Sequence, residues 1–282
     1  MSTVLRIDNL RIETDGDTPR TLVDGVSLRV DRGESLGVVG ESGSGKSLTV
    51  LAALGLLPVG TRVTGGRIVL DDRVLVDVEA DVWAGERELR ALRGRTAAMV
   101  FQDPMSSLDP LRAVGAQVAS AVRVHAPRLG RRAARERAID LLTSVGVRDA
   151  ADRAGTRPHQ WSGGMRQRAM IAMAIAHDPL LLIADEPTTA LDVTVQAQVM
   201  DLLAEVRERT GSTLVLITHP LENLNHIVLG SNDSGWAGLV LFLLALVIGG
   251  VLWALASPIS TKYPQKVQKI GAKMLGPINK WF

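Results

Sequence analysis

The sequence predicts an α/β fold in which a glycine-rich loop joins a buried strand to a helix, and three observations support this prediction. A short apolar run at 35–39 is followed by the glycine-rich stretch 40–47 and then by an apolar run of helix formers at 48–57. The later run 180–184 is continuously apolar, which is typical of a parallel strand buried on both faces, and 212–217 is predicted to be a further buried strand. Long stretches rich in Ala, Arg and Leu with helical spacing lie between the strands.

The stretch 40–47 reads Gly-Glu-Ser-Gly-Ser-Gly-Lys-Ser and is predicted to bind phosphate. Glycines let the backbone curl around an anion with its N–H groups pointing inward, and the following helix adds the positive end of its dipole. We expect Lys46 to reach the β- and γ-phosphates of a nucleotide and Ser47 to offer its hydroxyl to Mg²⁺. A flexible surface turn is the alternative. The residues predicted to contact the phosphates are Gly40, Glu41, Ser42, Gly43, Ser44, Gly45, Lys46 and Ser47.

Polar side chains follow the predicted strands at the edge where open α/β sheets bind their ligands. Asp185 and Glu186 follow one buried strand, and buried carboxylates require a cation or a proton. We expect Asp185 to hold Mg²⁺ and Glu186 to take a proton from the attacking water or to orient that water. Gln102 can point its amide at the metal and the water, although alone it would be an ordinary polar loop residue. The last strand delivers His219 to the same edge.

The sequence Ser162-Gly163-Gly164 begins another predicted helix. Ser162 is placed as an N-cap, and the two glycines leave backbone N–H groups bare for a second anion. A cap alone is the commoner meaning of this sequence. Its position upstream of the acidic strand end favours an anion site.

Two further regions complete the expected fold. Residues 4–30 alternate in strand fashion, and 66–76 has a two-residue acidic turn of hairpin type, so both are assigned to one antiparallel sheet. Residues 111–153 have helical spacing and predict a small helical subdomain, with outer bounds of about 104–160. Its arginines are interpreted as a solvent-facing surface and not as a ligand site.

Composition divides the chain near residue 220. Up to that residue there are 26 Arg and one Lys, which is Lys46, whereas the rest has five Lys and no Arg. The basic charge therefore belongs to the tail, and the larger part lacks the clustered basic and aromatic residues of a nucleic-acid surface, so no nucleic-acid partner is expected. The absence of cysteine excludes disulfides and thiolate metal sites. No signal peptide is recognisable at the N-terminus.

The tail is interpreted as a linker at 220–235 and a transmembrane helix at 236–256. The latter segment has no charged residue and is about 32 Å long as a helix, and Trp236 and Trp253 suit the interfaces. A buried core helix is the alternative. Residues 257–282 place lysines at three- and four-residue steps, which predicts a basic amphipathic helix on a membrane surface or, equally, a solvated face.

This interpretation meets a contradiction. The positive-inside rule states that segments rich in Lys and Arg beside a membrane helix face the cytosol. Because five lysines follow the span and no Lys or Arg lies in the 20 residues before it, the rule places the tail in the cytosol and the larger domain outside. Either the large folded domain overrides the rule, or the tail comes from an unrelated gene. The change from Arg to Lys favours an unrelated origin.

Taken together, the motifs resemble the ATP-binding subunit of ABC transporters, most closely its dipeptide/oligopeptide or nickel importer branch. The resemblance covers residues 1–219, the expected ATPase domain. The amino-acid sequences of 101–110 and 158–160 are similar to those of the importer branch. The matching motifs are the Walker A loop at 40–47, the Q-loop at Gln102, the signature sequence at 161–167, the Walker B strand at 180–186, the D-loop at 190–192 and the switch histidine His219.

The resemblance implies a P-loop NTPase core of RecA-like type, with ATP and Mg²⁺ bound between two subunits of a homo- or heterodimer. Ser162, Gly163, Gly164 and Asp192 would then face the nucleotide of the other subunit. Glu186, His219 and Gln102 would be catalytic, with Gln102 also beside the metal. The implied partners are transmembrane permease subunits and, indirectly, a solute-binding protein, with the ATPase at the cytoplasmic face of the membrane.

Two departures from the family pattern qualify this expectation. Relatives usually carry an aromatic residue near Thr14 that stacks on adenine, but no Phe, Tyr or Trp precedes Trp83 here, which predicts weak discrimination between ATP and GTP. The family also continues with further strands after His219. A truncated or fused, membrane-anchored nucleotide-binding protein with little turnover is therefore the alternative to an ATPase that energises a peptide importer.

Overall fold

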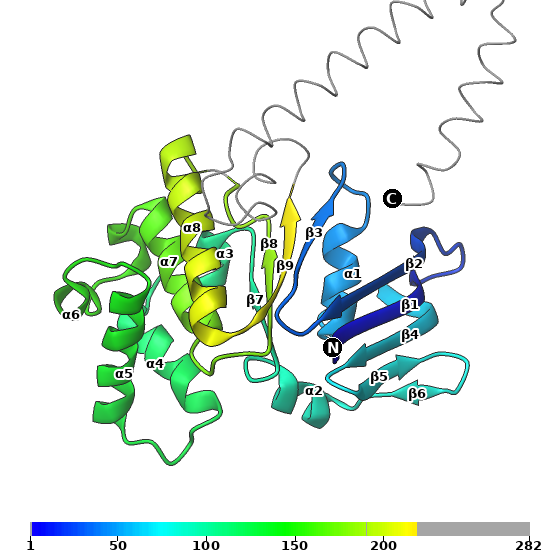
Figure 1. Ribbon diagram of the computed structural model, residues 1–282, viewed down its shortest axis with the longest axis horizontal. Helices are drawn as coiled ribbons and strands as arrows, with labels where there is room; N and C mark the ends of the chain where they lie inside the picture. Colours follow the sequence, from blue (N-terminus) through cyan, green and yellow to red (C-terminus); the bar gives the residue numbers. More distant parts are fainter. Residues whose placement is uncertain (1, 190, 219–282) are drawn as a thin grey trace, which may run out of the picture. The chain divides into compact units, whose positions relative to one another are not determined.

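An antiparallel sheet forms the N-terminal part of the described chain, residues 2–189 and 191–218 of the computed structural model (Figure 1). Its strand order is β2-β1-β4-β5-β6. In β1 the buried Leu5 and Ile7 flank the exposed Arg6, so the alternation in the sequence does predict which face is buried. The five strands are β1 (Thr3–Thr14), β2 (Thr21–Asp31), β4 (Thr61–Leu70), β5 (Arg73–Asp77) and β6 (Val82–Trp83).

The acidic hairpin turn expected within 66–76 joins β4 to β5. Asp71 and Asp72 both have positive φ angles, 47° and 61°, as a two-residue turn of the primed type requires. This hairpin therefore extends the sheet formed by the first two strands.

A second, wholly parallel sheet has the order β3-β9-β8-β7. Every residue of β7, β8 and β9 is buried, as expected for strands covered on both faces. Because all four strands run in the same direction, the residues that follow them meet at one edge. The four strands are β3 (Ser35–Val39), β7 (Ala97–Val100), β8 (Leu181–Asp185) and β9 (Thr213–Thr218).

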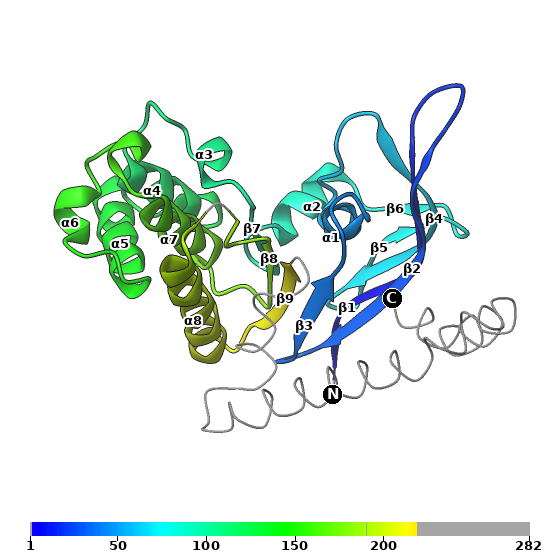
Figure 2. The same cartoon turned by 90° about the horizontal axis from the view of Figure 1, so that it is seen from above.

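Helices cover both faces of the parallel sheet. Figures 1 and 2 show α1 (Lys46–Ala53) on the side of the antiparallel sheet, and α7 (Gly163–Ala174) with α8 (Val193–Thr210) on the other side. Alternate residues of β8 belong to different cores: Leu181 packs with α1 and the antiparallel sheet, whereas Leu182 packs with the helices opposite. Because successive side chains of a strand point to opposite faces, the parallel sheet contributes residues to both cores and lies between them.

The region 104–160, predicted to be helical, contains short helices. They are α3 (Pro104–Ser107), α4 (Val114–Val124), α5 (Arg131–Ser144), α6 (Ala150–Arg153) and a 3₁₀ turn at Pro158–Gln160. Of these, α3, α4 and α5 pack against α7, and α6 packs against α5. A further helix, α2 (Glu86–Leu92), was not expected. It has only seven residues, too few for a clear helical period.

The predicted fold needs one correction, which concerns the transmembrane helix. Within residues 2–189 and 191–218, no helix has the length and apolarity to cross a membrane, so the fold class is assigned without such a helix. The segment 236–256, the linker at 220–235 and the tail at 257–282 lie outside the described residues. The prediction rested on hydropathy, length and the tryptophans Trp236 and Trp253, none of which distinguishes a membrane helix from other apolar segments.

Candidate functional site

The glycine-rich stretch forms the loop between β3 and α1. Gly45 is the N-cap of α1 and has a φ of +87°, a conformation that side chains other than glycine rarely adopt. A Cβ at this position would lie 2.9 Å from Val23 Cγ2 and 3.0 Å from the Leu22 carbonyl oxygen. The start of β2 therefore packs directly against the end of the loop, and only glycine fits there.

Lys46 lies across the loop that precedes it. Its Nζ donates hydrogen bonds to the carbonyl oxygens of Gly40, at 2.7 Å, and Glu41, at 2.6 Å. The side chain is only 8% exposed, so its positive charge is concentrated inside the curve of the loop. The ammonium group and the N-terminus of α1 together favour an anion at this position.

A hydrogen bond joins the loop helix to the acidic strand end. Ser47 Oγ donates to Asp185 Oδ1 at 2.9 Å, across 138 residues of sequence. Burial raises the pKa of the Asp185 carboxyl above its usual range, and Glu186 acts in the same direction, while the Ser47 hydrogen bond and Lys46 oppose the rise. A cation bound here would offset the cost of burying that charge.

The oxygen-bearing groups of Ser47 and Asp185 are of the kind that Mg²⁺ prefers. Gln102 follows β7 at the same sheet edge and could add its amide oxygen. No group of three or more His, Cys, Asp or Glu that could hold a metal occurs within residues 2–189 and 191–218. The donor set therefore fits a cation that keeps several waters and shares phosphate oxygens, as Mg²⁺ does.

Glu186 is anchored by its backbone and by its side chain. Its backbone N–H donates to the Ile217 carbonyl of β9 at 2.9 Å, and its φ of +45° is unusual for a residue with a side chain. Its Oε2 accepts hydrogen bonds from Gln102 Nε2 at 2.7 Å and from Thr189 Oγ1 at 3.2 Å. Two residues predicted to be catalytic, Gln102 and Glu186, are thus in direct contact.

Ser162 and Asp192 both cap helices. Ser162 Oγ accepts from the Met165 N–H at 3.3 Å at the start of α7, and Asp192 Oδ1 accepts from the Val195 N–H at 3.0 Å at the start of α8. A Cβ on Gly164 would lie 2.6 Å from Val195 Cγ1, so this glycine allows α7 and α8 to approach closely.

Within the described ranges, no hydrogen bond connects 162–164 or Asp192 to the loop 40–47. Their predicted contact with nucleotide stays a prediction. His219 lies outside the described residues.

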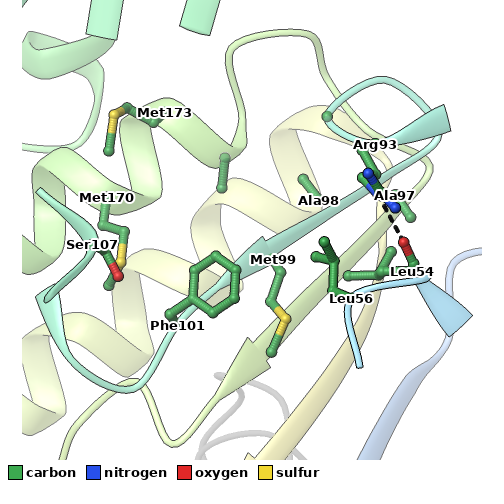
Figure 3. A pocket seen from close by; sticks show the side chains of 12 residues that line it. Leu54, Leu56, Arg93, Ala97, Ala98, Met99, Phe101, Ser107, Met170 and Met173 are labelled. Carbon is green, nitrogen blue, oxygen red and sulfur yellow. Dashed lines mark hydrogen bonds between the residues drawn. The ribbon is translucent and has the colours of Figure 1, made fainter. Parts of the chain in front are cut away.

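The sequence did not predict the apolar pocket beside Gln102. Its volume is about 260 Å³, and Figure 3 shows the side chain of Phe101 among methionines and leucines. Arg93 closes one end by donating to the Leu54 carbonyl at 2.7 Å. Since the lining comes from four separate segments, no local pattern could have revealed it. The apolar side chains that line the pocket most prominently are Leu54, Leu56, Met99, Phe101, Met170 and Met173.

Comparison with known proteins gives consistent results. The family model described as "ABC transporter" matches residues 23–189. The oligopeptide transport ATP-binding protein OppD of Mycobacterium tuberculosis is 48% identical over 223 residues, covering 78% of this chain and 35% of that protein. The dipeptide transport ATP-binding protein DppD of Escherichia coli is 48% identical over 219 residues, covering 77% and 65%. The chain thus spans between about a third and two thirds of the length of these relatives.

Solved structures agree with these relatives. The dimeric structure of an ATP-binding cassette bound to ADP and phosphate has a TM-score of 0.65 at 28% identity, covering 76% of this chain and 88% of that one. CbiO1 of Clostridium perfringens, part of the ABC transporter complex CbiONQ, has a TM-score of 0.63 at 26% identity, covering 81% of both chains. The match to the family model and these likenesses lead to one conclusion: the chain belongs to the ABC transporter family and carries its ATP-binding domain.

Proposed function

We propose that this chain is the subunit that binds and hydrolyses ATP to energise a peptide importer. The observation that carries the proposal is the 2.9 Å hydrogen bond from Ser47 to Asp185, because it joins the phosphate loop to the acidic strand end. The names of the relatives, oligopeptide and dipeptide transport ATP-binding proteins, support peptides as the cargo. The alternative of a membrane-anchored protein with little turnover has no comparable support.

The proposed reaction rests on positioning and charge. The N–H groups of residues 40–47 bind the phosphates, and Lys46 leaves the carbonyls of Gly40 and Glu41 to bind phosphate oxygens. Ser47, Asp185 and Gln102 would hold Mg²⁺, which neutralises phosphate charge.

Glu186 accepts a proton from water as the water oxygen bonds to the γ-phosphorus and the bond to the β–γ bridging oxygen breaks. His219 is proposed to contact the γ-phosphate. The products are ADP and inorganic phosphate.

We propose that a second subunit lies opposite the loop; the similar cassette structure is a dimer, which supports pairing in general kind. Ser162, Gly163, Gly164 and Asp192 would complete the nucleotide site of the partner. This subunit would be a second copy or a related chain. The complex would lie on the cytoplasmic face of the membrane, attached to permease subunits that receive solute from a binding protein.

The apolar pocket beside Gln102 is our candidate for the surface that contacts the permease. Phe101 is 39% exposed although it is large and apolar, and the nearby Met105 is 49% exposed. Exposed apolar side chains grouped around a pocket favour an interface with another protein. Phe101→Asp should weaken binding to permease-containing membranes about tenfold while ATP hydrolysis by the isolated chain stays unchanged.

The central test is Glu186→Gln in the full chain. A positioned general base contributes about 10²-fold or more, so phosphate release should fall by at least that factor while a fluorescent ATP analogue still binds. Glu208→Gln, an exposed change on α8, serves as the control and should leave turnover unchanged. Near-normal turnover of Glu186→Gln would remove Glu186 from this role.

A further inference from the structure

We infer that Thr189 is a positioning residue for the Glu186 carboxylate. This inference rests on the proposed function, because it assigns the group that orients the proposed base. Thr189 Oγ1 donates to Glu186 Oε2 at 3.2 Å, and the Thr189 N–H donates to the Glu186 carbonyl, also at 3.2 Å. One residue thus binds both the backbone and the side chain of Glu186.

The local sequence explains this double contact. Glu186, Pro187, Thr188 and Thr189 form a four-residue turn closed by the backbone hydrogen bond from Thr189 to Glu186. Proline restricts φ at the second position of the turn, which favours its closure. The hydroxyl of Thr189 is therefore held beside the Glu186 side chain by the turn itself.

The second donor to the same oxygen is held differently. Gln102 Nε2 lies 2.7 Å from Glu186 Oε2, but Gln102 is 84 residues away in sequence and follows a different strand. Its position depends on the segment after β7, whereas Thr189 moves with Glu186 as part of one turn. Thr189 is thus the donor that keeps its place if the segment carrying Gln102 shifts when nucleotide or a partner binds.

The chemical consequence concerns the orientation of the proposed base. Donation from Thr189 to Oε2, together with the turn that links the two backbones, restricts rotation of the Glu186 carboxylate. A carboxylate held in one orientation keeps its proton-accepting oxygen in place relative to the attacking water, as a general base requires.

The experiment measures ATP hydrolysis by the full chain in four variants. Thr189→Val removes the hydroxyl at nearly constant shape and should lower kcat about 5- to 10-fold, with KM for ATP changed less than twofold. Thr189→Ser restores the donor and should stay within about twofold of wild type. Thr189→Ala repeats the loss of the hydroxyl with a smaller side chain, should Thr189→Val fold poorly. The matched control is Thr143→Val, because Thr143 is exposed on α5 and its hydroxyl donates to the Ile139 carbonyl of its own helix, away from the proposed site.

A double mutant separates a positioning role from a merely structural one. In the Glu186→Gln background, measured by single turnover, Thr189→Val should cause almost no further loss, because the base on which it acts is already gone. An equal further loss in that background, or wild-type kcat for Thr189→Val itself, would overturn the inference. Wild-type turnover of Glu186→Gln would instead contradict the proposed function, so the two failures are distinguishable.

Discussion

The two turns of this chain that suit an anion, 40–47 and 162–164, are built differently. The first is completed within the chain: Lys46 closes it, Ser47 binds Asp185, and Gln102 meets Glu186 at the same sheet edge. The second is a capped helix start that packs on α8, and in the described part of the chain no hydrogen bond joins it to the first. This difference agrees with our proposal that the groups proposed to be catalytic lie beside the first turn, and that the second turn contributes to the nucleotide site of a partner subunit.

Mixing two inactive variants tests this difference most strongly. Lys46→Ala damages the first turn and Ser162→Arg blocks the second, and each alone should lower ATP hydrolysis by about 100-fold or more. A head-to-tail pair with one protomer of each kind has one intact site, formed by Lys46 of one and Ser162 of the other. An equal mixture should recover roughly a quarter of wild-type turnover if the two sites act independently.

Ser162 is exposed, so the arginine can be accommodated at about the cost of a lost helix cap, ~1 kcal/mol. Each variant assayed alone at the same total concentration is the control. Failure to recover activity on mixing would show that two copies of this chain do not share sites.

Replacing a glycine by alanine in each turn compares the backbone strain of the two turns, measured as the loss of folding stability. Gly45 has a φ of +87°, and a Cβ there would lie 3.0 Å from the Leu22 carbonyl oxygen. Gly45→Ala should therefore lower the free energy of unfolding by about 2–3 kcal/mol and the Tm by about 5–10 °C. At Gly163 a Cβ would meet only Leu191 Cδ2, at 3.2 Å, and φ is not positive. Gly163→Ala should therefore change stability by less than about 0.5 kcal/mol. Equal losses in thermal unfolding would contradict the proposed difference in backbone strain.

Asp185 gives the first turn a pH dependence that the second lacks. Burial raises the pKa of Asp185, so its contribution to stability is full below the unfolded-state pKa and is lost as pH rises through the folded-state value. At pH 7 Asp185→Asn, which carries no charge, should therefore raise the Tm. The gain should shrink toward pH 4, and a lower Tm at pH 7 would contradict it.

The difference between the turns also decides what could be predicted from sequence. The contact of Ser47 with Asp185 was within reach, because both follow parallel strands whose carboxyl ends share an edge. The contact of Gln102 with Glu186 depends on strand order and on loop geometry after β7, which residue patterns do not specify. The pocket around Phe101 combines four segments, and its position follows only from their packing.

Segment length limited the remaining predictions. The four-residue α3 and the two-residue β6 are too short for a period to be recognised. The apolar run at 236–256 showed the opposite problem, since length and hydropathy suggested a membrane helix that the fold assignment does not retain. Patterns were most informative where continuous buried strands set the positions of polar residues directly after them, as at Asp185.

Base selectivity is the smallest expected effect, because we propose that both turns contact phosphates and assign neither of them a contact with the nucleobase. The loop before β2 is closed by hydrogen bonds between Thr14 and Arg20 and has no aromatic residue. Trp83, the first aromatic in the sequence, lies on β6, three positions from β1 in strand order, where its Nε1 donates to Asp81. Without a ring to stack on the base or a buried donor to read its edge, we expect ATP and GTP to compete within about fivefold of each other.

Thr14→Tyr is the matched gain-of-contact variant for this prediction. A tyrosine ring near the base should tighten both purine nucleotides about five- to tenfold, since stacking contributes ~1–3 kcal/mol and does not depend on the base edge. The ratio of ATP to GTP affinity should then stay close to that of the wild type. The measurement is competition of ATP and GTP with a fluorescent nucleotide for the unmodified chain. A strong preference for ATP would mean that groups outside the β1–β2 hairpin contact the base. The two turns would then not be sufficient to explain nucleotide binding.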